Sequence, residues 1–178
     1  MIKKPYLSPP PWKSRLRREI RTAQNSVILA AGNTSKSDDG AAVLCAQKLK
    51  KLMGGKARSR LKILFGHETP ENTTGEIRKF HPNLVLILDT ARGQYKPGTV
   101  FLVEKDDIEE DGVSTHRISL ALLVSYLEET IGCKVMVLGI QPLDLRLGEN
   151  ISPIVKKSAK NLAAFLSQII GVKPTRYA

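Results

Sequence analysis

The feature that most constrains the fold is the alternation of short apolar runs with segments of helical periodicity. The apolar runs have the length of strands, and they are Ser26–Ala31, Leu61–Phe65, Leu84–Leu88 and Lys134–Ile140. Apolar strands that are separated by helices are typical of a mostly parallel sheet buried on both faces. A chain of 178 residues is long enough for one such core. We therefore predict an α/β fold, a single three-layer domain with a mostly parallel twisted sheet and helices on both faces.

Glycine and proline mark the ends of the predicted helices. Gly54-Gly55 and Gly132 follow helical patterns, and Ser152-Pro153 has the residue types of an N-cap and a first helical position. Helices are expected at Trp12–Gln24, between Asp39 and Gly54, at Thr73–Phe80, at Ile118–Ile131 and from Pro153 to about Ile170. After a Lys-Pro-Gly turn, Thr99–Val103 fits a short antiparallel strand at the edge of the sheet.

Positive charge is concentrated at the N-terminus. The net charge is +11, and residues 1–24 hold seven basic residues against Glu19 alone, which gives this segment +6. We expect residues 1–24 to form a basic arm with a helix, residues 25–171 to form the folded domain and residues 172–178 to form a tail. A second basic cluster spans Lys48–Lys62. Aromatic residues make up 5% of the chain and do not interleave with either cluster, which argues against nucleic acid as a partner.

The chain has no apolar run near the ~20 residues that a membrane helix needs. Its basic N-terminus lacks the apolar region and cleavage site of a secretory signal, so we expect a cytoplasmic protein without a membrane span. Two cysteines, Cys45 and Cys133, do not make a disulfide framework or a metal-binding pair of the Cys-x-x-Cys type. We expect both to be reduced and buried.

Three polar residues follow or precede the predicted elements at one edge of the sheet. Asp39 comes after the first strand, Asp89 ends the third, and His116 lies before the next helix. Ligands of parallel sheets bind beyond the carboxyl ends of the strands. Two carboxylates and an imidazole suit a divalent metal such as zinc or nickel, with positions left for water or substrate. The alternative is structural, with Asp38, Asp39 and His116 as helix caps and Asp89 as a strand end.

Five sequence elements in order carry a resemblance to a known family. They are Gly32-Asn33 with Asp38-Asp39-Gly40-Ala41, Thr69-Pro70-Glu71-Asn72, the run LVLILDTARG that contains Asp89, Ser114-Thr115-His116-Arg117, and Leu138-Gly139-Ile140-Gln141-Pro142. From about Ser26 to Leu166, the chain resembles the [NiFe] hydrogenase maturation endopeptidases, particularly the type that serves hydrogenase 3.

The resemblance implies a reaction and a site. Members of this family are aspartate-dependent proteases that remove a C-terminal peptide from the precursor of the hydrogenase large subunit after nickel insertion. The resemblance makes Asp39, Asp89 and His116 both the catalytic and the metal-contacting residues. The nickel is supplied by the substrate and serves as the recognition signal, so no permanent cofactor is required. Which of the two carboxylates accepts a proton during hydrolysis stays open.

Further residues near the same edge are candidates for contact with the substrate. Glu71 and Asn72 could hold the substrate tail, although Asn72 also suits a turn or helix cap. His67 and Glu68 could bind metal or substrate, but residues of this kind are more often ordinary polar groups of a loop. His81, which precedes a proline, is interpreted as a loop residue.

The chain departs from the family pattern in the loop that carries Asp39. Ala30-Ala31-Gly32-Asn33 stands where Gly-x-Gly-Asn is usual, and Ser37 stands where the family has a small, glycine-like residue. These changes spare the three site residues and bear on loop shape and substrate choice. Two other functions remain open at this point: a non-proteolytic binding module that uses the basic arm on nucleic acid or an acidic partner, and a hydrolase of small metabolites.

Overall fold

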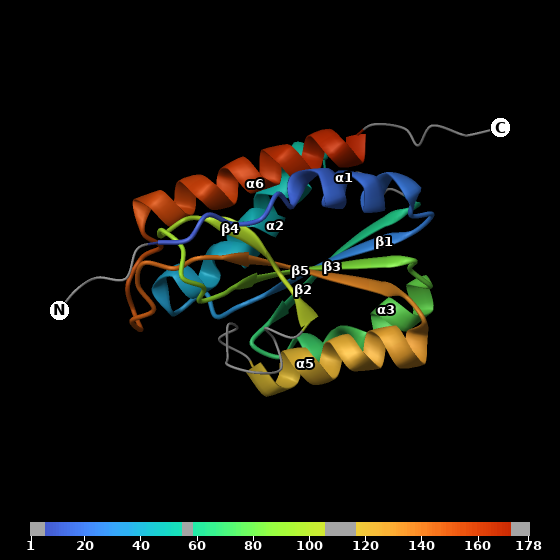
Figure 1. The fold of residues 1–178 in the computed structure, drawn as a ribbon. Helices are drawn as coiled ribbons and strands as arrows, with labels where there is room; N and C mark the ends of the chain where they lie inside the picture. The colour runs from blue at the N-terminus through green and yellow to red at the C-terminus, as the bar shows by residue number, and fades with distance from the viewer. Residues whose placement is uncertain (1–5, 55–58, 106–116, 172–178) are drawn as a thin grey trace.

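Five strands form one sheet in the computed structural model, which describes residues 6–54, 59–105 and 117–171 (Figure 1). The strands are β1 (Ser26–Ala31), β2 (Leu61–His67), β3 (Leu84–Thr90), β4 (Val100–Val103) and β5 (Lys134–Ile140). Their order is β2-β1-β3-β5-β4. The pairs β1–β2, β1–β3 and β3–β5 are parallel, and β4 pairs with β5 antiparallel. The prediction of a mostly parallel sheet with an antiparallel edge is confirmed.

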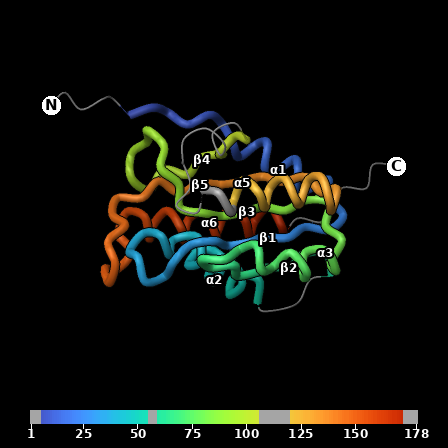
Figure 2. Tube along the Cα trace, turned by 90° about the horizontal axis from the view of Figure 1, so that it is seen from below, coloured from blue at the N-terminus to red at the C-terminus, as the bar shows by residue number. Residues whose placement is uncertain are grey.

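Helices cover both faces of the sheet, as predicted (Figures 1 and 2). One layer contains α1 (Lys13–Thr22), α2 (Ala41–Leu52) and α6 (Pro153–Gly171); the other contains α3 (Thr74–Phe80) and α5 (Arg117–Tyr126). A π-helical segment, η3 (Leu127–Ile131), continues α5, and two 3-10 turns, η1 (Ser37–Gly40) and η2 (Pro70–Thr73), precede α2 and α3. Within the described ranges, no helix has both the length and the apolarity for a membrane span.

The apolar strands supply a separate core to each helical layer. In β3, Leu84, Leu86 and Leu88 pack in the cluster beneath α2 and α6, whereas Val85 and Ile87 pack in the cluster beneath α5. This division follows from the two-residue repeat of a strand, which turns successive side chains to opposite faces. Each fully buried aliphatic side chain contributes roughly 1.5–3 kcal/mol. Cys45 and Cys133 are buried free thiols, as predicted, and burial raises the pKa of Cys45 to about 12.

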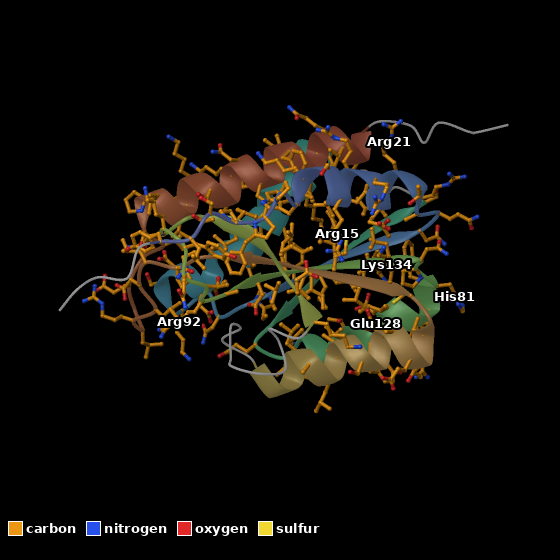
Figure 3. All side chains as sticks on the ribbon, viewed as in Figure 1. Arg15, Arg21, His81, Arg92, Glu128 and Lys134 are labelled. Atoms are coloured by element: carbon orange, nitrogen blue, oxygen red, sulfur yellow. The ribbon has the colours of Figure 1, made fainter. Side chains whose placement is uncertain are left out.

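The basic arm packs onto the domain through α1. Leu16 is fully buried, and the Trp12 ring meets the Phe165 ring of α6 edge-on at a centroid distance of 5.5 Å. Ion pairs join Arg15 to Glu104 and Glu19 to Lys134, both at 2.9 Å. Figure 3 shows Arg15 and Lys134 on the side of α1 that faces the sheet. The helical part of the arm is thus held by both apolar and charged contacts.

The helix α2 begins differently from the prediction. Its N-cap is Gly40, and no side-chain hydrogen bond caps it. The structural alternative, in which Asp38 and Asp39 serve as caps of this helix, is therefore wrong, because both carboxylates accept hydrogen bonds from other segments. The tail predicted from residue 172 lies outside the described residues.

Asp38 joins two distant loops beneath the carboxyl ends of the strands. Its fully buried carboxylate accepts hydrogen bonds from the backbone N–H groups of Leu143, Asp144 and Ser152, at 2.8, 2.9 and 2.6 Å. The Ser152 hydroxyl donates a fourth, at 2.9 Å. Oriented N–H and O–H groups offset the loss of water around a buried carboxylate. Asp38 thereby fixes η1 against the segment between β5 and α6.

Replacement of Asp38 should destabilise the whole domain. Asp38→Asn places a donor NH₂ where donors converge and removes the charge that strengthens these hydrogen bonds, so we expect a loss of about 3 kcal/mol in the free energy of unfolding. Urea denaturation measures the loss. The matched control is Asp144→Asn on the same loop, whose carboxylate contacts Arg146 at the surface and should matter much less. Equal stability of Asp38→Asn and the unaltered chain would contradict this role.

The ion pair of Glu19 should make the packing of α1 sensitive to acid. The hydrogen bond from Lys134 lowers the pKa of Glu19, so the ionised carboxylate stabilises the folded state. This contribution is complete above the unfolded-state pKa of about 4.3 and is lost as the pH falls through the lower folded-state pKa. Glu19→Gln should therefore lower the thermal midpoint by roughly 2 °C at neutral pH. At acidic pH, Glu19→Gln and the unaltered chain should have the same thermal midpoint. The control Glu129→Gln, at an exposed position, should leave the midpoint unchanged at both neutral and acidic pH.

Candidate active site

Two aspartates lie at the carboxyl ends of adjacent parallel strands. Asp89 is a fully buried residue of β3, and Asp39 lies in η1, the turn that follows β1. β1 and β3 pair in register from Ser26–Leu84 to Ala30–Leu88, so the segments after Ala30 and Leu88 emerge side by side. This is the edge at which α/β sheets place their ligands. The predicted location of both carboxylates is therefore observed.

A close backbone approach shapes the loop that carries Asp39. Gly32 has φ +123°, and a Cβ atom at this position would lie 2.1 Å from the Asp39 carbonyl oxygen. Glycine is required here because both the conformation and the space exclude a side chain. The next residue, Asn33, donates its backbone N–H to Oδ2 of Asp39 at 2.9 Å. The end of β1 thus orients the Asp39 carboxylate.

Thr90 connects the two aspartates. Its hydroxyl donates to the Asp38 carbonyl oxygen at 3.0 Å and lies 3.4 Å from the Asp39 carbonyl oxygen. Its backbone N–H donates to Oδ1 of Asp89 at 2.8 Å. One residue therefore contacts the turn that carries one carboxylate and the side chain of the other. Its position directly after Asp89 in LVLILDT was the only signal for it in the sequence.

Ser37 occupies a conformation that favours glycine. Its φ is +37°, and its hydroxyl donates to the Asn150 carbonyl oxygen at 2.9 Å. Strain of this kind costs of the order of 1 kcal/mol or more, and the hydrogen bond offsets part of it. The resemblance implied a small, glycine-like residue at this position, and the positive φ gives the physical reason for it.

The motif around Gly139 packs tightly behind Asp89. Gly139 pairs with Asp89 across the sheet, and a Cβ atom on Gly139 would lie 2.6 Å from Cβ of Ala91. Gln141 is buried, and its Oε1 accepts a hydrogen bond from the Gly93 N–H at 2.8 Å. Both contacts hold the segment after β3 against the end of β5. These residues support the site and were predicted only as parts of a sequence motif.

Polar residues that follow β2, the strand next to β1, lie beside the site. Asn33 donates its side-chain N–H to Oε1 of Glu68 at 2.5 Å, so Glu68 contacts the residue that orients Asp39. His67 is exposed and has φ +51°. Glu71 and Asn72 are exposed in η2, directly after this strand. Asn72 does not cap α3, whose N-cap is Thr73.

Arg92 adds a positive charge after the end of β3. It is exposed and follows Asp89 by three residues. Figure 3 shows Arg92 and His81 at opposite ends of the molecule, with His81 before β3 and Arg92 after it. His81 therefore lies away from the candidate site, in agreement with its interpretation as a loop residue.

His116, the third predicted site residue, lies outside the described residues. Among the residues that the structure does describe, no group of three or more His, Cys, Asp or Glu side chains could hold a metal ion. The described part of the site consists of the two buried carboxylates, which can accept protons or coordinate a cation brought by another molecule. The predicted roles of Asp39, Asp89 and His116 remain predictions.

Comparison with known proteins supports the assignment suggested by these features. The sequence profile of the family described as "Hydrogenase maturation protease" matches residues 43–169. The hydrogenase 3 maturation protease of Escherichia coli K12 is 35% identical over 117 residues, which cover 65% of this chain and 72% of that protein. The matched region begins after Asp39, so the position of the turn η1 is known from the structure and not from the profile.

Solved structures share the fold. The crystal structure of the [NiFe] hydrogenase maturation protease HycI from Thermococcus kodakarensis has a TM-score of 0.80 at 29% identity and covers 89% of this chain and 99% of that one. The solution structure of the endopeptidase HycI from Escherichia coli has a TM-score of 0.70 at 28% identity, over 85% of this chain and 94% of that one. The chain therefore belongs to the hydrogenase maturation proteases and is a peptidase.

Proposed function

We propose that this protein removes the C-terminal peptide from the precursor of a [NiFe] hydrogenase large subunit after nickel insertion. The observation that supports the proposal best is the placement of Asp39 and Asp89 at the carboxyl ends of β1 and β3, with Thr90 in contact with both segments. We assign the catalytic role to Asp39, Asp89 and His116, as an aspartate-dependent protease acting in the cytoplasm.

Nickel enters this proposal as part of the substrate. Carboxylate and imidazole groups are suitable ligands for a nickel ion whose coordination is incomplete. A precursor without nickel offers these ligands nothing to complete, so it binds less well in the reactive position. The protease then needs no permanent cofactor, and cleavage reports that the precursor has been loaded.

Hydrolysis requires a proton acceptor beside the scissile carbonyl. A water oxygen attacks the carbonyl carbon, the carboxylate of Asp39 or Asp89 takes a water proton, and that proton passes to the leaving nitrogen as the C–N bond breaks. Both carboxylates are almost completely buried, where charges act more strongly than in water. The two residues are equivalent candidates for the proton acceptor.

Exposed apolar side chains near the active edge favour a macromolecular substrate over a small metabolite. Leu143 and Leu147 lie on the loop after β5, and Ile154 lies in the first turn of α6; they are 62%, 73% and 50% exposed. Exposed large apolar residues that cluster along one segment are typical of protein interaction sites. We assign Glu71 and Asn72, both exposed after β2, to contact with the substrate tail.

Nickel dependence is the first test. Incubation with nickel-loaded precursor should shorten the large subunit by its C-terminal peptide, and the nickel-free precursor should stay intact. Mass spectrometry of both precursors measures the difference. A loaded precursor that stays intact would argue for the non-proteolytic binding module, whereas cleavage of both forms would remove nickel as the recognition signal.

The site residues should be required for cleavage without being required for folding. Asp39→Asn, Asp89→Asn and His116→Ala should each lower the cleavage rate by roughly 10²-fold or more, the usual range for a lost acid–base group. Single-turnover assays on loaded precursor measure the rate, and circular dichroism checks the fold. Asp144→Asn serves as the control with an altered surface carboxylate, and an unimpaired Asp39→Asn would refute the assignment.

A further inference from the structure

A groove of about 780 Å³ lies between β2 and α2, beside the candidate active site. It is lined by Gln47, Lys50, Lys51, Gly54, Phe65 and His67. The first strand in the sheet order is β2, so the groove follows an edge of the sheet. A hollow of this size is sufficient for several residues of an extended peptide.

One end of the groove adjoins the loop that orients Asp39. The His67 carbonyl oxygen accepts a hydrogen bond from the Gly32 N–H at 2.8 Å. The residue after Gly32, Asn33, donates its own N–H to the Asp39 carboxylate at 2.9 Å. His67, at the start of the groove, is therefore connected through Gly32 and Asn33 to the carboxylate of Asp39, a proposed catalytic group.

From His67 the groove leads away from the active edge. Phe65 precedes His67 on β2, and α2 starts beside η1 at the active edge and continues through Gln47 toward Gly54. Gln47 lies on α2, and Gly54 lies two residues beyond the end of the helix at Leu52. At the helical rise of ~1.5 Å per residue this stretch is about 10 Å long, which an extended chain spans with about three residues. The geometry suits a short tail that leaves the site in one direction.

The lining changes in character along this path. Near the site, the rings of Phe65 and His67 stack at a centroid distance of 6.3 Å and an angle of 29°. At the Phe65 end of this pair, which is farther from the active edge than His67, the Lys50 ammonium lies 5.8 Å from the Phe65 ring centroid. The next residue, Lys51, is exposed. An aromatic surface followed by two positive charges complements a peptide that ends in a carboxylate.

We propose that this groove binds the C-terminal extension of the precursor, with its terminal carboxylate at Lys50 and Lys51. The proposal rests on the function proposed above, and it names the side of the site to which the departing peptide extends. A chain terminus is the one point of any extended peptide that always carries a carboxylate. Charge complementarity at the far end of the groove therefore recognises the tail without requiring a particular sequence.

Peptide binding tests this proposal independently of proteolysis. The probe is a synthetic, fluorescently labelled peptide that matches the C-terminal extension of a large-subunit precursor from the same organism and contains no scissile bond. Fluorescence anisotropy with the full chain should show that the free-acid peptide binds about fivefold more tightly than its C-terminal amide. In Lys50→Ala/Lys51→Ala, this preference should disappear. Equal binding of acid and amide by the unaltered chain would overturn the proposal.

A second pair of lysines provides the matched control. Lys156→Ala/Lys157→Ala removes the same charge from the exposed surface of α6 and should keep the fivefold preference. Loss of the preference in this control as well would overturn the proposal in favour of general charge attraction. With loaded precursor, Lys50→Ala/Lys51→Ala should raise KM about fivefold and leave kcat unchanged. Failure of the unaltered chain to cleave would refute the proposed function, while the acid–amide comparison would still decide the groove.

Discussion

The geometry of the candidate site depends on the buried carboxylate of Asp38. Asp38 accepts hydrogen bonds from a loop and a helix start that lie more than a hundred positions away in the chain. A buried carboxylate is tolerated because four donors converge on it. These hydrogen bonds fix the turn η1, and η1 positions the neighbouring residue, Asp39, at the carboxyl edge of the sheet. Of these two consecutive aspartates, Asp38 stabilises the loop structure and Asp39 belongs to the candidate site.

Backbone constraints, more than side-chain packing, define the loop around Asp39. Position 32 must be glycine because the Asp39 carbonyl oxygen occupies the space of a side chain. Ser37 has a positive φ, and its hydroxyl donates a hydrogen bond to the Asn150 carbonyl oxygen. Local strain is maintained where the surrounding structure determines the conformation, and such positions are common at functional sites. Ser37 thus holds a backbone conformation that favours glycine, with a hydrogen bond that offsets part of the strain.

Basic residues of the N-terminal arm make contacts within the protein. Arg15 pairs with Glu104, and Lys13 and Arg17 lie 5.7 and 5.8 Å from the Phe165 ring centroid. The contacts with Phe165 hold α1 along α6, in the same layer as α2. The excess of basic residues at the N-terminus is therefore at least in part a means of fastening a helix to the domain, and it does not by itself indicate a nucleic-acid partner.

The sequence by itself determined the layered fold, because apolar strands of this length can satisfy both their hydrogen bonds and their side chains only inside a parallel sheet covered by helices. It also placed Asp39 and Asp89 at one edge, since parallel strands end together. Tertiary structure alone decided that Asp38 and Asp39 have different partners, that Thr90 touches both halves of the site, and that a groove with two lysines adjoins it. These features depend on contacts between segments far apart in the chain, and local periodicity carries no information about such distances.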